Sequence, residues 1–281
     1  MSFQAAMAFR KRLQAFSDQS KSLPFSGDII NKMILIGKDA ISLRIYLPEH
    51  TQAKSIALFI HGGGFVAGNI SSHENVCRTL ASRMSAVFVS VEYPLAPEVK
   101  HQKITEACYQ ALCWVADNAG CFNALSNKLM VVGDSAGGNL AAVCALMARD
   151  RQGPQLSCQI LINPITDLVH PGIYEQYRDC YLSNEAEQTH AYVSPLYADL
   201  CGLPPAFIVL HKEDCLYEQG KQYATLLNRA GVKVIEKCFS GGHLGYHFAN
   251  VDERSEEPIS WLLDSLSSFL IYSTGTSTLI K

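Results

Sequence analysis

The sequence predicts an α/β fold built on a mostly parallel, doubly wound sheet. From residue 55 onward, short apolar runs alternate with stretches of helical periodicity. One of these runs leads directly into Gly133-Asp134-Ser135-Ala136-Gly137, and an Ala-rich helical stretch follows. Strands joined through helices run parallel, so their carboxyl ends meet at one edge of the sheet. We expect the functional residues at this edge.

The composition indicates a globular protein with a single domain. The chain has 281 residues, of which 48% are hydrophobic, and a net charge of −3. This length favours one domain over residues 1–281. The slight acidity gives no reason to expect nucleic acid or an anionic membrane as a partner. Ten cysteines lie without Cys-x-x-Cys spacing, so we expect no zinc site, no other metal and no disulfide scaffold.

The N-terminus carries no pattern typical of a secretory signal. Arg10, Lys11 and Arg12 interrupt it, and no run in the chain is long enough to span a bilayer. We therefore expect a cytoplasmic protein with no membrane partner. A homodimer stays open as its oligomeric state.

The N-terminal third begins with a helix and a hairpin. Residues 3–16 place Phe3, Met7, Leu13 and Phe16 near one helical face. This helix either packs on the core or forms part of a lid over a pocket. Residues 29–36 and 41–47 are then predicted to form two antiparallel strands joined by a tight turn.

The remaining elements alternate along the chain. Strands are expected at 55–60, 86–91, 128–132, 156–162, 205–210 and 232–239, and helices at 71–84, 104–118, 136–149, 217–230 and 258–272. Ser71 with Glu74 predicts a capping box, and Pro258 is predicted to open the last helix. The pattern weakens over 169–195, which is either an inserted cap segment lining a pocket or a solvated excursion.

Ser135 is predicted to be an activated nucleophile. It stands between an apolar strand and a helix, which is the context in which Gly-x-Ser-x-Gly forms a nucleophile elbow. Side chains at Gly133 or Gly137 would collide with the neighbouring strand or helix in such a turn. The adjacent helix N-terminus favours developing negative charge.

The segment His61-Gly62-Gly63-Gly64-Phe65 directly follows the strand at 55–60. Three consecutive glycines expose backbone N–H groups, as an oxyanion hole made of main chain requires. A flexible glycine loop is the alternative, but the nearby nucleophile favours the hole. We interpret His61 as a hydrogen-bonding brace for the loop, because it precedes the serine in the chain.

The acid and the base of a catalytic triad are expected further along. Asp214 and His243 each follow a predicted strand, and the order serine, acid, histidine is that of α/β-hydrolases. Asp167 also follows a strand and is the main competitor for the acid. Glu213 and Glu218 are weaker candidates.

These motifs together resemble the hormone-sensitive-lipase family of α/β-hydrolases, with bacterial acetyl esterases as its nearest members. The resemblance rests on residues 61–65, 133–138 and 222–231, and covers residues 40–270. It implies a carboxylesterase with a small helical cap, built from about 1–25 and 169–195. It also implies an oxyanion hole formed by Gly62, Gly63 and the N–H of Ala136, and Asp214 as the triad acid.

The chain departs from the family pattern at three places. Cys215 stands where the family has a proline after the acid, and Pro94 stands where it has an arginine. Counting from Gly231 without gaps puts Leu244 at the position of the catalytic histidine. Leucine cannot accept a proton, so we expect the neighbouring His243 to be the base, with His247 as the alternative.

The expected function is hydrolysis of small, short-acyl esters through Ser135, His243 and Asp214, without a cofactor. An amidase or arylformamidase on the same scaffold is the nearest alternative. A non-catalytic ligand-binding protein, similar to the plant gibberellin receptors, is the alternative from another class.

Overall fold

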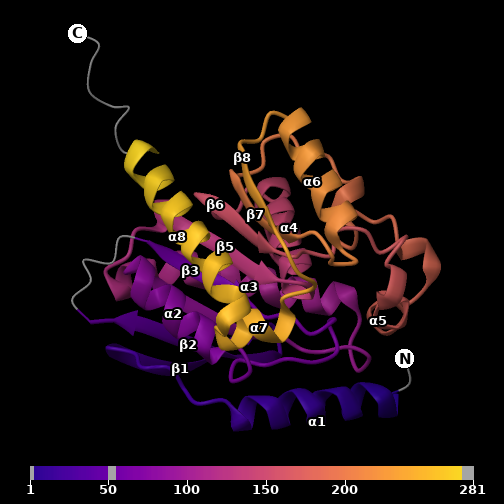
Figure 1. The fold of residues 1–281 in the computed structure, drawn as a ribbon, viewed down its shortest axis with the longest axis horizontal. Helices are drawn as coiled ribbons and strands as arrows, with labels where there is room; N and C mark the ends of the chain where they lie inside the picture. The colour runs from indigo at the N-terminus through magenta and orange to yellow at the C-terminus, as the bar shows by residue number, and fades with distance from the viewer. Residues whose placement is uncertain (1–2, 50–54, 274–281) are drawn as a thin grey trace.

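A computed structural model describes residues 3–49 and 55–273 of the chain. Its centre is one eight-stranded sheet with the order β1-β2-β4-β3-β5-β6-β7-β8 (Figure 1). The strands are β1 (Gly27–Ile36), β2 (Asp39–Pro48), β3 (Ile56–Ile60), β4 (Val87–Glu92), β5 (Leu129–Asp134), β6 (Cys158–Ile162), β7 (Ala206–His211) and β8 (Val234–Phe239). β2 runs antiparallel to β1, as predicted for the hairpin, and also to β4. The other neighbours are parallel, which confirms the predicted mostly parallel sheet.

Helices cover both faces of the sheet. On one face lie α2 (Glu74–Met84), α7 (Gly245–Asn250) and α8 (Glu253–Ser273), and on the other α3 (His101–Asn118), α4 (Ala136–Asp150) and α6 (Tyr217–Arg229). α1 (Phe3–Gln19) runs along the lower edge of Figure 1, and α5 (Glu175–Tyr181) stands near its first turns. This arrangement is the doubly wound α/β fold that the alternating pattern predicts.

The central strands are apolar because both of their faces are covered. Every residue of β3, β5, β6 and β7 is buried. A strand of this kind reads as a continuous hydrophobic run, whereas β1 at the sheet edge is mostly exposed. The buried strands fix the positions of the loops at their carboxyl ends, where the predicted site residues lie.

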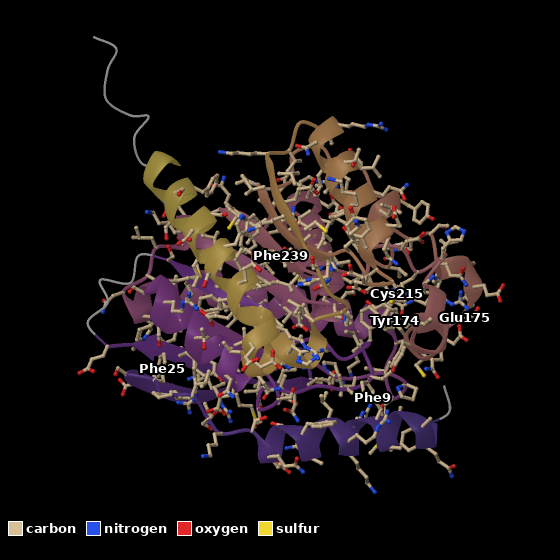
Figure 2. The ribbon with its side chains drawn as sticks, in the orientation of Figure 1. Phe9, Phe25, Tyr174, Glu175, Cys215 and Phe239 are labelled. Carbon is tan, nitrogen blue, oxygen red and sulfur yellow. The ribbon has the colours of Figure 1, made fainter. Side chains whose placement is uncertain are left out.

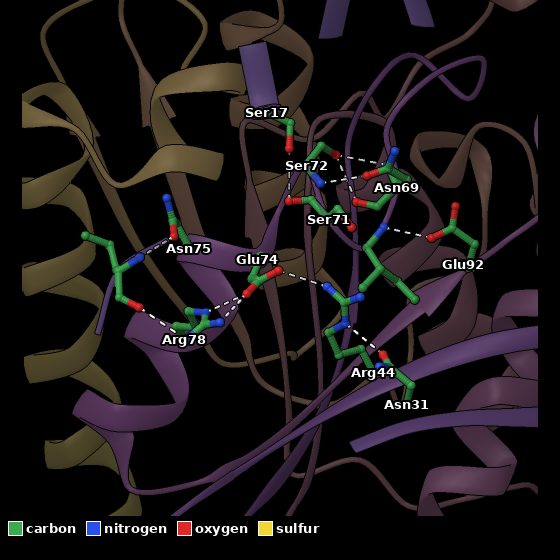
Figure 3. A network of polar contacts seen from close by, with 12 residues as sticks. Ser17, Asn31, Arg44, Asn69, Ser71, Ser72, Glu74, Asn75, Arg78 and Glu92 are labelled. Carbon is green, nitrogen blue, oxygen red and sulfur yellow. Dashed lines mark hydrogen bonds and ion pairs between the residues drawn. The ribbon is translucent and has the colours of Figure 1, made fainter. Parts of the chain in front are cut away.

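Three helix starts differ from the sequence prediction, and two of them are predicted from specific signals; α3 begins at His101, three residues earlier than expected. The capping box at Ser71 and Glu74 is wrong, because the Glu74 carboxylate binds Arg44 and Arg78 instead (Figure 3). Pro258 does not open the last helix, since α8 begins five residues earlier at Glu253 and contains the proline. Both predictions used local sequence signals. At α2 the distant Arg44 binds the carboxylate of the predicted capping box, and at α8 the helix tolerates a proline.

No helix in the described part of the chain combines the length and the apolar character that crossing a membrane requires.

The glycine turn before α4 yields a prediction about stability. A Cβ atom at Gly137 would lie 2.0 Å from the carbonyl oxygen of Ile60, which is backbone and cannot move away cheaply. We expect Gly137→Ala to lower the free energy of unfolding by roughly 1–3 kcal/mol or more in urea titrations. Gly120→Ala is the control, because Gly120 is exposed and an added Cβ meets no atom within 4 Å. Equal effects of the two substitutions would contradict the prediction.

Candidate active site

Ser135 occupies the sharp turn between β5 and α4. Its backbone has φ 55° and ψ −117°, a conformation that non-glycine residues rarely adopt. Its N–H donates a hydrogen bond to the carbonyl of Ile162 at 2.8 Å, which ties the turn to the neighbouring strand. A Cβ at Gly133 would lie 2.1 Å from the carbonyl oxygen of Gly137, so the turn closes only with glycine there.

His243 lies between Ser135 and Asp214. Its Nε2 is 2.9 Å from the Ser135 hydroxyl oxygen, and its Nδ1 is 2.8 Å from Oδ2 of Asp214. Gly241, with φ 110°, gives the loop after β8 the backbone freedom to present the imidazole there. The structure therefore brings together all three predicted triad residues.

Asp214 is buried but well supplied with hydrogen-bond donors. Oδ1 accepts the backbone N–H of Leu216 at 3.0 Å, and Oδ2 accepts Nδ2 of Asn163 at 2.6 Å in addition to His243. Burial by itself would raise the pKa of Asp214, but the hydrogen bond from His243, its charge and the other donors outweigh burial and lower the pKa. The carboxylate thus stays ionised where a histidine base works.

Asn163 and His211 extend this arrangement one step further, and sequence reasoning did not find them. Both are buried, and Nδ1 of His211 is 3.1 Å from Oδ1 of Asn163. This contact, with the one to Asp214, fixes which end of the Asn163 amide faces the carboxylate. Burial lowers the pKa of His211, which favours its neutral form. One sequence feature could have indicated Asn163: it is a polar residue directly after β6, at the sheet edge where the carboxyl ends of the strands meet.

The alternative base, His247, and the alternative acid, Asp167, make contacts with other residues. His247 binds Asp252 and Arg254. Asp167 accepts the backbone N–H of Val169 at 2.8 Å and lies 3.0 Å from Nδ1 of His170. Neither belongs to the hydrogen-bonded chain of Ser135. Leu244, which counting without gaps places at the position of the catalytic histidine, is buried in the core beside α2 and α8. Its side chain therefore contributes to packing.

The glycine loop requires one correction. The N–H of Gly62 donates to Oδ1 of Asp134 at 3.0 Å, so it is not available to an oxyanion. Gly63 and Gly64 line the pocket at Ser135, and within the described residues their N–H groups donate no hydrogen bond. Ala136 is the first residue of α4, whose N–H has no partner within the helix.

His61 braces this loop, as the sequence suggested. Its Nδ1 donates to the carbonyl of Gly62 at 2.9 Å, and its ring stacks on Tyr93 with centroids 4.2 Å apart. Burial, reinforced by the nearby His73, lowers the pKa of His61 to about 3. The brace is therefore an uncharged imidazole at neutral pH.

A cavity of about 410 Å³ opens above Ser135. α1 contributes Phe9, Arg12, Leu13 and Phe16 to its wall, and the other side chains include Tyr174, Tyr177 and His243. In Figure 2, Phe9 points from α1 toward the body of the molecule, and Tyr174 lies beside Cys215. Two separate segments thus roof the cavity. Their role as a cap, predicted over about 1–25 and 169–195, stays a prediction.

Among the described residues, no cluster of three or more His, Cys, Asp or Glu side chains is arranged to hold a metal ion.

Comparison with known proteins identifies the family. A family model described as alpha/beta hydrolase fold matches residues 57–248. The chain belongs to this α/β-hydrolase family. Carboxylesterase NlhH of Mycobacterium tuberculosis is 36% identical over 218 residues, covering 70% of this chain and 68% of that protein. The resemblance to hormone-sensitive-lipase-like carboxylesterases is thereby confirmed.

Solved structures of α/β-hydrolases agree with this result. A hyperthermophilic esterase from Pyrobaculum calidifontis superposes with a TM-score of 0.85 at 31% identity, over 95% of this chain and 91% of that chain. The carboxylesterase EstE1, cloned from a metagenomic library, gives a TM-score of 0.86 at 30% identity, over 95% and 97%. The chain is accordingly a carboxylic ester hydrolase.

The geometry at Ser135 predicts selective covalent labelling. A serine-directed fluorophosphonate should add one equivalent to the native protein, because the Ser135 hydroxyl lines the cavity and contacts an imidazole. Ser135→Ala should take up none, and intact-protein mass spectrometry measures both. Ser72→Ala is the matched control, since Ser72 also contacts a histidine ring, at 2.9 Å, but is not among the residues lining this cavity. Labelling of Ser135→Ala would contradict the assignment.

Proposed function

We propose that this hydrolase is a serine carboxylesterase for small, short-acyl esters, with Ser135, His243 and Asp214 as its catalytic triad. The observation that carries the proposal is the position of His243, within hydrogen-bond distance of both the serine hydroxyl and the Asp214 carboxylate. That arrangement is the one in which a histidine removes a proton from serine as serine attacks a carbonyl.

The reaction follows from these contacts. Nε2 of His243 accepts the hydroxyl proton while Oγ of Ser135 bonds to the ester carbonyl carbon. Asp214 holds the Nδ1–H tautomer and offsets the imidazolium charge. His243 then protonates the departing alkoxide, which leaves as an alcohol and gives an acyl-serine. Water attacks this acyl group by the same steps and releases the acid.

We assign the oxyanion hole to the N–H groups of Gly63, Gly64 and Ala136, in place of the set that includes Gly62. The first two line the pocket and are free of other acceptors in the described residues, whereas the N–H of Gly62 already binds Asp134. Donors of this kind stabilise the developing oxyanion by roughly 3–4 kcal/mol each. They lie at the N-terminus of α4 and in the loop after β3, on either side of Ser135.

A short acyl group suits the size of the cavity. Phe9, Leu13 and Phe16 on α1, with Tyr174 and Tyr177, close it at about 410 Å³. We infer that the segments at 1–25 and 169–195 act as the cap. Amide or formamide substrates would use the same triad, and their rates relative to esters separate that alternative. A ligand-binding protein without catalysis is disfavoured by the contact between His243 and Ser135.

Hydrolysis of p-nitrophenyl butyrate by matched histidine variants tests the proposed function. His243→Ala should lower kcat by about 10⁶-fold, because it removes the general base, whereas His247→Ala should retain most activity. Native activity should fall on acidification, since a protonated base cannot accept the serine proton. Full activity in His243→Ala with loss in His247→Ala would reverse the assignment. No hydrolysis by the native protein would overturn the proposal.

Asn163 should act as a positioning residue for Asp214. Asn163→Ala removes one donor to the carboxylate, and we expect kcat to fall about tenfold with KM nearly unchanged. Asn163→Asp places a second carboxylate beside Asp214, and the added negative charge opposes loss of a proton from the hydrogen-bonded group to which Asp214 belongs. The acid limb of the pH–rate profile should therefore move to higher pH.

Asp167→Asn is the control for this prediction, because Asp167 caps a separate loop and contacts His170. It should leave the profile in place. A profile unchanged in Asn163→Asp would show that Asn163 serves folding alone.

A further inference from the structure

We propose that Arg12 forms a carboxylate-binding subsite in the active-site cavity, so that the preferred substrates are esters that carry a second, anionic group. This inference rests on the proposed esterase function and adds the substrate class. It starts from the way α1 is attached to the rest of the molecule.

Polar contacts add to the apolar packing that holds α1, which comes from Ala6, Phe9 and Leu13. Ala6 is its only buried residue among those described. Arg10 also anchors the helix, with Nη1 and Nη2 each 2.7 Å from the Glu98 carboxylate, Nη2 2.8 Å from the carbonyl of Ala96, and Nε on the carbonyl of Val66. A planar guanidinium with this many fixed acceptors sets both the position and the rotation of a helix.

Further contacts hold the same side of α1 against the loop before α2. Nδ2 of Asn69 donates to Gln14 at 2.7 Å, and the Ser17 hydroxyl donates to the carbonyl of Ser71 at 3.2 Å (Figure 3). The rotation fixed in this way places another face, made by Phe9, Arg12, Leu13 and Phe16, at the wall of the cavity, with Arg12 and Phe16 exposed to solvent. These positions follow the spacing i, i+3, i+4 and i+7, which places them on one helical face.

Arg12 is the cationic side chain of this face, and it has no acidic partner in the part of the chain that the structure describes. Among the described residues it makes no ion pair, and its guanidinium lies 5.8 Å from the centroid of the Phe9 ring. Burial raises the pKa of Tyr177, and the charge of Arg12 partly opposes that rise. Tyr177 packs directly on Gly64, so the field of Arg12 reaches the wall of the cavity beside the oxyanion loop.

The other charged group that lines the cavity does not neutralise Arg12. Asp134 is buried, and Oδ1 accepts the N–H of Gly62 and lies 3.4 Å from Nε2 of His73. The remaining wall is dominated by aromatic and aliphatic side chains. An arginine at such a surface favours a ligand carboxylate, since guanidinium binds it with two parallel hydrogen bonds. An ester with a terminal carboxylate offers both an apolar body for this wall and an anionic group for Arg12.

The test compares two esters of similar length, monophenyl glutarate and phenyl pentanoate. Native protein should hydrolyse the anionic ester with the higher kcat/KM, and Arg12→Gln should lower the ratio of the two values about tenfold. Phenyl pentanoate lacks the carboxylate and is the reference, so the ratio is independent of any general change in turnover. Arg12→Lys should restore part of the ratio, because it retains the charge but not the planar fork. Salt at 0.5 M should reduce the native preference.

Lys11→Gln is the matched control, since it removes an equal charge from the neighbouring position, which does not line this cavity. A second pair, 3-acetoxybenzoate and 3-methylphenyl acetate, places the carboxylate on the alcohol side. A selective loss in Arg12→Gln for either pair supports the subsite. An unchanged ratio for both pairs, or an equal change in Lys11→Gln, would overturn it. Failure to hydrolyse even phenyl pentanoate would instead overturn the proposed esterase function.

Discussion

The close contact of main chain around Ser135 is the constraint on which the site depends. β5 must turn into α4 within one residue, and the backbone of Gly133 and Gly137 passes so near to neighbouring carbonyl groups that no Cβ atom fits. Ser135 is thereby held at a positive φ, with its hydroxyl above the sheet edge. The packed parallel strands on either side supply the rigidity that keeps this strained conformation in place.

From this turn, hydrogen bonds extend through buried polar groups that lie far apart in the chain. His243, Asp214, Asn163 and His211 come from the ends of β6, β7 and β8, and each contacts the next at hydrogen-bond distance. A low-dielectric surrounding strengthens such contacts and makes a missing partner costly. Asp214 can stay ionised in a buried position because several donors replace the water that it lost.

The roof of the cavity is organised differently from its floor. The floor is fixed by apolar packing of the sheet, whereas α1 has a single buried residue among those described, Ala6, and is attached also by Arg10 and a few side-chain hydrogen bonds. Arg10 forms an ion pair with Glu98. Glu98 lies in the loop in which Pro94 stands at the position of the family's usual arginine.

The sequence by itself determined the alternation of strands and helices, the mostly parallel sheet and the turn at Ser135, because periodicity, glycine spacing and strand ends are local properties. It also indicated Asp214 and the loop at 241–245. Only the tertiary structure decided which histidine reaches Ser135, because Leu244 packs in the core and turns His243 toward the sheet edge. It likewise showed that the N–H of Gly62 is taken by Asp134, and that Asn163 and Arg12 face the site. These facts depend on contacts between segments distant in the chain, which no local pattern records.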